Sequence, residues 1–175
     1  MSPEPQLVTA SFYGALMPDV PVDIIRSPRR KRTISATLTE GRLRVRVPAG
    51  LEPAEETRLV DQAKSRVLRR AISGGVDLQA RAVELANRYG LRRPTSIVWS
   101  TRQMQRWGSC SPDEGRIRIS DRLAAMPSWV LDSVIVHELA HLEVPDHGPG
   151  FRTLIERYEL TERARGYLMA KGDGI

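Results

Sequence analysis

Residues 134–142, VIVHELAHL, form the stretch from which the architecture of this chain can be predicted. Apolar residues before and between its polar ones predict a buried helix. Residues four apart on a helix lie one turn apart on the same face, so His137 and His141 can aim at one point with Glu138 beside them. A helix offers two nitrogen ligands to zinc, and a general base to a zinc-bound water, in this way.

The third predicted metal ligand is His147. The chain has three histidines in 175 residues, and all three fall between positions 137 and 147. Pro145 ends the helix or closely follows its end, so His147 lies in a turn that can fold it back under the metal. A catalytic zinc ion needs three protein ligands and one open position. The other downstream candidates are carboxylates: Glu156 on the next helix as the second choice, then Asp146 and Glu143.

These parts predict a hydrolytic mechanism that uses Zn²⁺ and Glu138. Zinc lowers the pKa of its bound water, Glu138 takes the proton, and the hydroxide attacks a polarised carbonyl. Glu138 then passes the proton to the leaving amine. The oxyanion needs one further donor besides zinc, and the candidates are Arg102, Arg106 and Tyr158.

Cys110 is the single cysteine of the chain, so it cannot form an internal disulfide. The N-terminal residues lack a basic segment followed by an apolar run, and no stretch is long and apolar enough to span a membrane. The sequence therefore predicts a cytoplasmic protein with no membrane partner. Cys110 could act as a nucleophile, but every histidine that could serve it belongs to the predicted metal site. A small residue on a strand beside the cleft is the favoured interpretation.

Patterns along the chain predict an α+β fold that begins with a flexible tail at residues 1–18 and an N-terminal β-segment at 19–50. Two-residue alternation and turn residues predict the strands. Helical spacing, prolines and glycines predict the helices. The expected strands are 20–26, 33–39, 42–47, 95–100, 107–111 and 116–120. The expected helices are 53–74, 77–89, 121–126, a long one opening at 127–128, 149–158 and 161–169.

The β-segment is strongly basic, within a chain whose net charge is +6. Leu43, Val45 and Val47 alternate with arginines, which predicts a strand with one apolar and one basic face. The block at residues 26–32, RSPRRKR, lies in the connection before it. A solvated turn is the favoured interpretation of this block, and a surface that binds nucleic acid or phosphate is the alternative.

Several segments together resemble the YgjP-like metallopeptidase domain. They are RWGSCS at 106–111, a Gly115-x-Ile117-x-Ile119 strand, the VHELAHL helix and HGPGF at 147–151. The HGPGF piece is also similar to SprT-like proteases, and the basic β-segment resembles the start of YgjP-like proteins.

The resemblance implies a minimal zincin-like fold over residues 51–175. This fold has a small, mostly antiparallel sheet, an active-site helix and backing helices. The resemblance also assigns metal ligation to His137, His141 and His147 and catalysis to Glu138. The chain is therefore expected to be a zinc-dependent metallopeptidase that acts on a protein or peptide. The strand at 107–111 could hold such a substrate by backbone pairing, through Trp107, Gly108, Ser109 and Cys110.

Two other functions stay open at this point. One is a metal-dependent hydrolase of nucleoside polyphosphates, in which basic strands hold the phosphates. The other is a nucleic-acid-associated SprT-like protease or binding module, in which the arginine-rich β-segment positions nucleic acid near the cleft.

Overall fold

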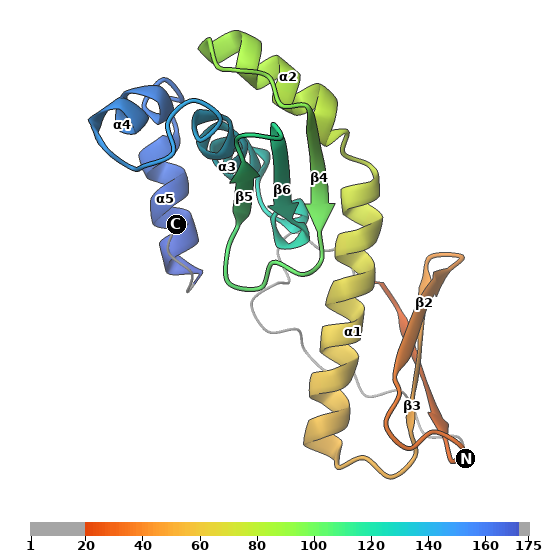
Figure 1. Ribbon diagram of the computed structural model, residues 1–175. Coiled ribbons are helices and arrows are strands. Elements are labelled where there is room, and N and C mark those ends of the chain that lie inside the picture. Colours follow the sequence, from red (N-terminus) through yellow and green to blue (C-terminus); the bar gives the residue numbers. More distant parts are fainter. Residues whose placement is uncertain (1–19, 172–175) are drawn as a thin grey trace. The chain divides into compact units, whose positions relative to one another are not determined.

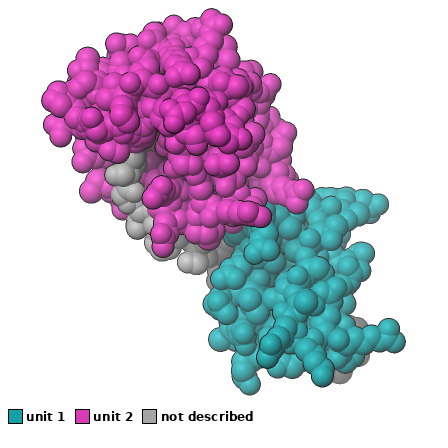
Figure 2. Space-filling model, in the orientation of Figure 1, with its two compact units in different colours: residues 1–68 teal, residues 69–175 magenta. Residues whose placement is uncertain are grey.

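The computed structural model describes residues 20–171, so the tail predicted at residues 1–18 lies outside the described residues. The described chain is a mixed α+β structure with two small sheets and five α-helices, which confirms the predicted fold class (Figure 1). Two compact units, residues 1–68 and 69–175, divide the chain inside its first helix (Figure 2). None of the helices within residues 20–171 is long and apolar enough to cross a membrane.

The first unit contains a three-stranded sheet. Its strands are β1 (Val22–Ser27), β2 (Ser35–Thr39) and β3 (Arg42–Pro48), in the order β1-β3-β2. Glu40 and Gly41 join β2 to β3 with φ values of 54° and 73°. Positive φ at both central residues is what a type I′ turn requires, so a two-residue hairpin joins the strands expected at 33–39 and 42–47.

The two faces of β3 differ as predicted. Leu43, Val45 and Val47 are fully buried and pack with Val60 of helix α1 (Pro53–Gly74). The arginines between them are exposed, and Arg42 donates two hydrogen bonds to Asp23 on β1, at 3.1 Å and 2.7 Å. One face of this sheet is thus an apolar core closed by α1, and the other is basic.

The second unit contains the other sheet, with strands β4 (Ser96–Ser100), β5 (Gly108–Ser111) and β6 (Arg116–Ser120). The order is β4-β6-β5, with β4 parallel and β5 antiparallel to β6. The expectation of a mostly antiparallel sheet is therefore wrong, because each sheet has one parallel and one antiparallel pairing. The connection at residues 101–107 carries the chain past the position of β6 to the far edge, so the strand that returns as β6 runs parallel to β4.

The remaining helices surround α3 (Ser128–Ala140), which packs against β5, β6, α2, α4 and α5. Their bounds are Leu78–Tyr89 for α2, Asp121–Ala125 for the 3-10 helix η1, Pro149–Ile155 for α4 and Thr161–Ala170 for α5. The sequence predicts α4 to continue to residue 158, but the helix ends at Ile155. A turn follows it, and Thr161 donates its hydroxyl to the carbonyls of Ile155 and Tyr158 there.

Helix α3 is buried on nearly all sides. Its residues 130–136 and 138–140 are all buried, including Asp132 and Glu138. A helix that is apolar all round is stable only inside a core. The structure thus places the histidine-bearing helix at the centre of the second unit, where its position is fixed from several directions.

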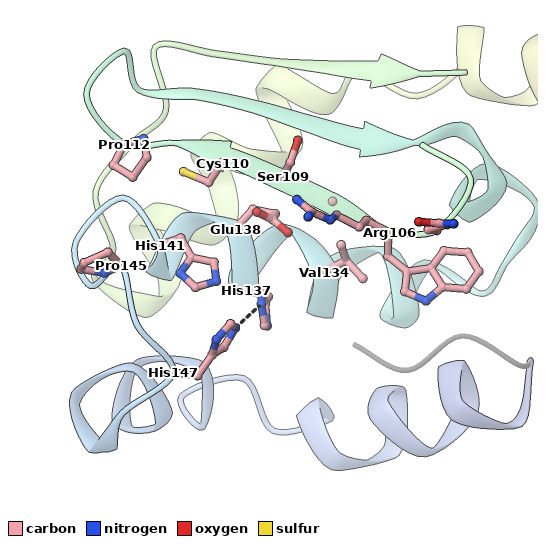
Figure 3. Close-up of a pocket in the computed structure, with 13 residues that line it drawn as sticks. Arg106, Ser109, Cys110, Pro112, Val134, His137, Glu138, His141, Pro145 and His147 are labelled. Carbon is pink, nitrogen blue, oxygen red and sulfur yellow. Dashed lines mark hydrogen bonds between the residues drawn. The ribbon is translucent and has the colours of Figure 1, made fainter. Parts of the chain in front are cut away.

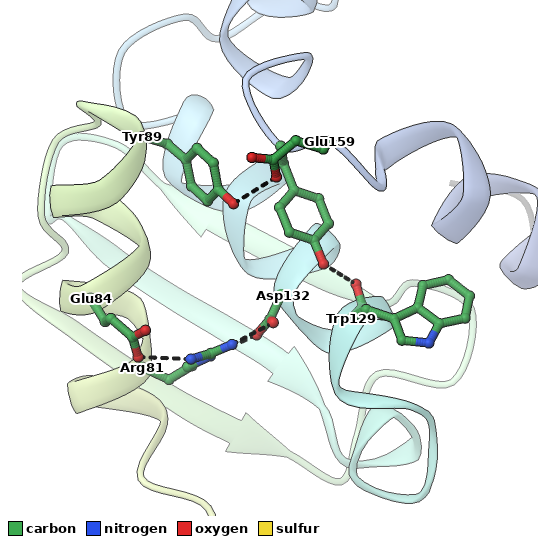
Figure 4. Close-up of polar contacts among 7 residues, drawn as sticks. Arg81, Glu84, Tyr89, Trp129, Asp132 and Glu159 are labelled. Carbon is green, nitrogen blue, oxygen red and sulfur yellow. Dashed lines mark hydrogen bonds and ion pairs between the residues drawn. The ribbon is translucent and has the colours of Figure 1, made fainter.

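An ion pair with a buried carboxylate ties α3 to α2 (Figure 4). Arg81 of α2 donates to both carboxylate oxygens of Asp132, at 2.8 Å and 2.6 Å, and the Asp132 side chain is only 8% exposed. Arg81 also donates to the exposed Glu84 on its own helix. A bidentate arginine–carboxylate pair fixes direction as well as distance, so it sets how α3 lies against α2.

Replacing Arg81 tests this pair. Arg81→Ala leaves the buried Asp132 carboxylate without its partner, so it should lower the free energy of unfolding by about 1.5–3 kcal/mol. Glu84→Ala removes only the exposed contact and should cost less than about 0.5 kcal/mol. Urea denaturation of both variants measures the difference. Equal losses would show that the Asp132 pair does not anchor α3.

Candidate metal centre

The three histidines converge at the end of α3 (Figure 3). One possible ligand atom from each of His137, His141 and His147 lies within 4.8 Å of the other two. The Nε2 atoms of His137 and His147 are 3.3 Å apart. His141 caps α3 with helical φ and ψ of −67° and −16°, so the one-turn spacing predicted for His137 and His141 is kept. This set of three imidazoles could hold a metal ion.

The surroundings of His137 and His141 favour the neutral form of imidazole, which is the form that binds metals. Burial lowers the pKa of His137 to about 3, and the neighbouring His141 and His147 act in the same direction. Burial also lowers the pKa of His141. The Nδ1 atom of His141 lies 3.1 Å from the carbonyl oxygen of Val144. Because Nδ1–H donates to that carbonyl, Nε2 is left with a free lone pair toward the other rings.

Phe151 supports all three rings, and the sequence analysis gave it no role. Its ring stacks on His141 with centroids 4.4 Å apart, and it meets His137 at 4.8 Å and His147 at 4.7 Å. Phe151 is 1% exposed, in the first turn of α4. An aromatic residue four positions after a histidine, and two after a helix-starting proline, was the available signal.

Glu138 points toward β5, where Gly108 makes room for it. A Cβ atom on Gly108 would lie 2.7 Å from both Cδ and Cγ of Glu138 and still closer to Oε1. Glu138 is 5% exposed, and its burial raises its pKa to about 8, although the charge of Arg106 opposes this. A side chain at position 108 would therefore have to displace the Glu138 carboxylate from its present place.

A cleft of about 520 Å³ contains the three histidines and Glu138. The predicted substrate residues Trp107, Gly108, Ser109 and Cys110 all line it. Trp107 is 4% exposed and lies under the guanidinium of Arg122, so it forms part of the wall. Strand β5 is an edge strand, which leaves one of its edges unpaired within the described part of the chain.

The alternative metal ligands lie outside this group. Glu156 is exposed at the end of α4. Glu143 accepts a hydrogen bond from the backbone N–H of Arg92 at 2.8 Å. Asp146 accepts one from the backbone N–H of Gly148 at 2.8 Å, which closes the turn that carries His147. Among the described residues, only the three histidines form a group suited to a metal.

Of the three candidate oxyanion donors, two line cavities at the site and the third does not. Arg106 lines the cleft, and Arg102 lines an adjoining cavity. Tyr158 is 6% exposed and donates its hydroxyl to the carbonyl of Trp129 at 2.9 Å (Figure 4). Burial raises the pKa of Tyr158 to about 12. Tyr158 is therefore a structural residue, not a component of the cleft.

Cys110 lines the cleft from β5, as the favoured interpretation expects. Burial raises the pKa of its thiol to about 11, and the charge of Glu138 adds to the shift. The thiolate is the reactive form of cysteine. Its surroundings therefore oppose a nucleophilic role.

Comparison with known proteins agrees with this geometry. The model of the YgjP-like metallopeptidase domain family matches residues 53–165. The crystal structure of the metallopeptidase zymogen of Pyrococcus abyssi abylysin is similar in fold, with a TM-score of 0.50 and 18% sequence identity, over 57% of this chain and 99% of that one. No curated protein matched the chain. Because the family model covers more than half of its length, the chain belongs to the YgjP-like metallopeptidase family.

Proposed function

We propose that this protein is a zinc peptidase in which His137, His141 and His147 hold the metal and Glu138 is the general base. The observation that carries the proposal is the convergence of three imidazoles beside a buried carboxylate in one cleft. Neutral imidazole is the commonest zinc ligand, and three protein ligands leave one position open. The donor set therefore fits Zn²⁺.

The chemistry is divided between the metal and Glu138. Zinc, when bound, supplies Lewis acidity, which lowers the pKa of water and polarises a carbonyl. Glu138 accepts the proton of the attacking water on its carboxylate and transfers it to the nitrogen of the leaving amine. The fixed position of Glu138 against Gly108 means that it needs little rearrangement to do so.

Strand β5 supplies the peptide-binding surface in this proposal. Its open edge borders the cleft, so an extended peptide can add to the sheet there and hydrogen-bond to the backbone. Backbone pairing does not read side chains. Sequence preference therefore has to come from residues that flank the strand.

Removal of a ligand tests the metal assignment. His147→Ala should weaken zinc binding by more than the roughly 10–100-fold that loss of an outer hydrogen-bond partner costs. Glu156→Ala is the matched control, because Glu156 is exposed and outside the cluster. Competition with a chromophoric chelator measures both affinities. If zinc affinity falls in the Glu156 variant and stays unchanged in His147→Ala, the third ligand is Glu156.

Glu138→Gln tests the base and the bond that is cleaved. At equal zinc content, the variant should lose about 10²–10⁴-fold in peptide hydrolysis, because the amide cannot take up the proton. Native protein, Glu138→Gln and the control Glu156→Gln are assayed in parallel on casein, quenched fluorescent peptides and nucleoside triphosphates. Phosphate release that depends on Glu138, without any peptide cleavage, would replace the peptidase proposal with a nucleotide hydrolase.

Gly108→Ala tests the placement of Glu138 without altering its chemistry. The added methyl group has to displace the carboxylate, and a shift of about 1 Å in a catalytic group can cost roughly 10²-fold in rate. Zinc affinity should stay unchanged, because Gly108 does not touch the histidines. Gly166→Ala is the control, since a Cβ there meets nothing within 4 Å. Full activity of Gly108→Ala would show that hydrolysis does not depend on this position of Glu138.

A further inference from the structure

A second cavity of about 380 Å³ adjoins the metal cleft at the connection between β4 and β5. The two cavities have Gln105, Arg106 and Ser109 in common. The full lining of the second one is Arg102, Gln103, Met104, Gln105, Arg106 and Ser109. It thus contains two guanidinium groups, two amides and no carboxylate, and it is suited to an anion.

Neither guanidinium forms an ion pair with a carboxylate in the described part of the chain. Arg102 and Arg106 are exposed, and neither side chain has a hydrogen bond or an ion pair with a residue in the described part of the chain. Nearby Arg92, in contrast, donates to the carbonyl of Leu142 at 3.2 Å. A guanidinium carries five donors in a planar fork that matches a carboxylate. The two guanidinium groups at this cavity therefore have N–H donors available to hydrogen-bond an anionic group.

The direction of β5 determines which part of a peptide would meet these arginines. β5 runs from Gly108 to Ser111, and a peptide paired antiparallel to it would run from the Ser111 end toward Gly108. Antiparallel pairing is slightly more stable per residue than parallel pairing. Figure 3 shows Arg106 beyond Glu138, on the side away from Pro112 and Pro145. The part of the peptide that follows the scissile bond would thus approach Arg106 and Arg102.

We propose that Arg102 and Arg106 form a subsite for a carboxylate on the C-terminal side of the scissile bond. The proposal rests on the proposed peptidase function. The carboxylate comes either from an Asp or Glu side chain just after the cleaved bond or from the C-terminus of a short peptide. Both sources offer the same two oxygens to the guanidinium forks.

The subsite predicts that the protein prefers peptides with a carboxylate after the cleaved bond. This preference arises from binding and not from the catalytic step. A charge-assisted hydrogen bond should make the peptide with Glu about 10-fold to 100-fold better in kcat/KM than its Gln counterpart. Most of this difference should be in KM, because the subsite holds a part of the peptide that does not react. The preference should also fall with added salt, because both arginines are exposed.

The experiment first profiles cleavage of a peptide library by the zinc-loaded protein. It then compares matched peptides with Glu or Gln at the first two positions after the cleaved bond, each with a free or an amidated C-terminus. The variants are Arg102→Gln, Arg106→Gln, the double variant and Arg106→Glu. Arg165→Gln is the control, because Arg165 is an exposed arginine of α5 that lines neither cavity.

The Glu–Gln arm identifies a side-chain carboxylate, and the free–amidated arm identifies a C-terminal one. In the arm that shows the preference, the double variant should reduce it to less than about threefold. Arg106→Glu should reverse it, so that the Gln or amidated peptide is cleaved better than its carboxylate counterpart. Arg165→Gln should keep it. Equal cleavage of all matched peptides by the native protein would overturn the subsite and leave the peptidase intact. An equal fall in kcat for every peptide in Arg106→Gln would also overturn it, because Arg106 would then act on the reaction itself.

A binding measurement separates this proposal from the proposed function. Fluorescence anisotropy compares labelled peptides with Glu or Gln, free or amidated, on the Glu138→Gln protein, in which slowed hydrolysis leaves the peptides intact during the measurement. Tighter binding of a carboxylate form, lost in the double arginine variant, supports the subsite even if no peptide is hydrolysed. No cleavage of any peptide by the native protein would reject the peptidase, and equal binding of all forms would reject the subsite.

Discussion

The contact between Glu138 and Gly108 is the constraint on which the rest of the site depends. A carboxylate that is 5% exposed is costly to bury, and here it lies against a backbone that has no side chain to displace it. The contact requires β5 to pass directly over α3 and brings the open edge of β5 to the cleft. The edge strand, the carboxylate and the three histidines therefore border the same cleft.

The support around this contact is rigid on every described side. Phe151 holds three imidazole rings from one side, and the carbonyl of Val144 sets the tautomer of His141. The Arg81–Asp132 pair fixes α3 against α2, six residues before Glu138. A catalytic constellation works when each member is held by packing and by an outer layer of hydrogen bonds. Placing the site on a helix that is buried on nearly all sides meets that condition.

Much of this arrangement follows from local patterns in the sequence. The spacing of His137 and His141 depends only on helical geometry, and the turn at Glu40-Gly41 depends only on two φ angles. The mixed pairing of β4, β5 and β6 was not predictable in this way, because it depends on which edge the 101–107 connection reaches. The close contact of Gly108 with Glu138 was not predictable from local patterns either. A glycine required by a distant side chain has the same local signature as one required by a turn.

The two sides of the cleft differ in their chemistry, and the catalytic motif alone does not reveal this difference. The three imidazoles lie on one side of Glu138. On the other lie two arginines that have no ion pair within residues 20–171. A peptide that pairs with the edge of β5 gains the same backbone hydrogen bonds whatever its side chains are. Backbone pairing therefore contributes affinity without distinguishing one peptide sequence from another. Any preference among peptides has to arise where the strand ends, and at the Gly108 end Arg106 lies two residues before the strand.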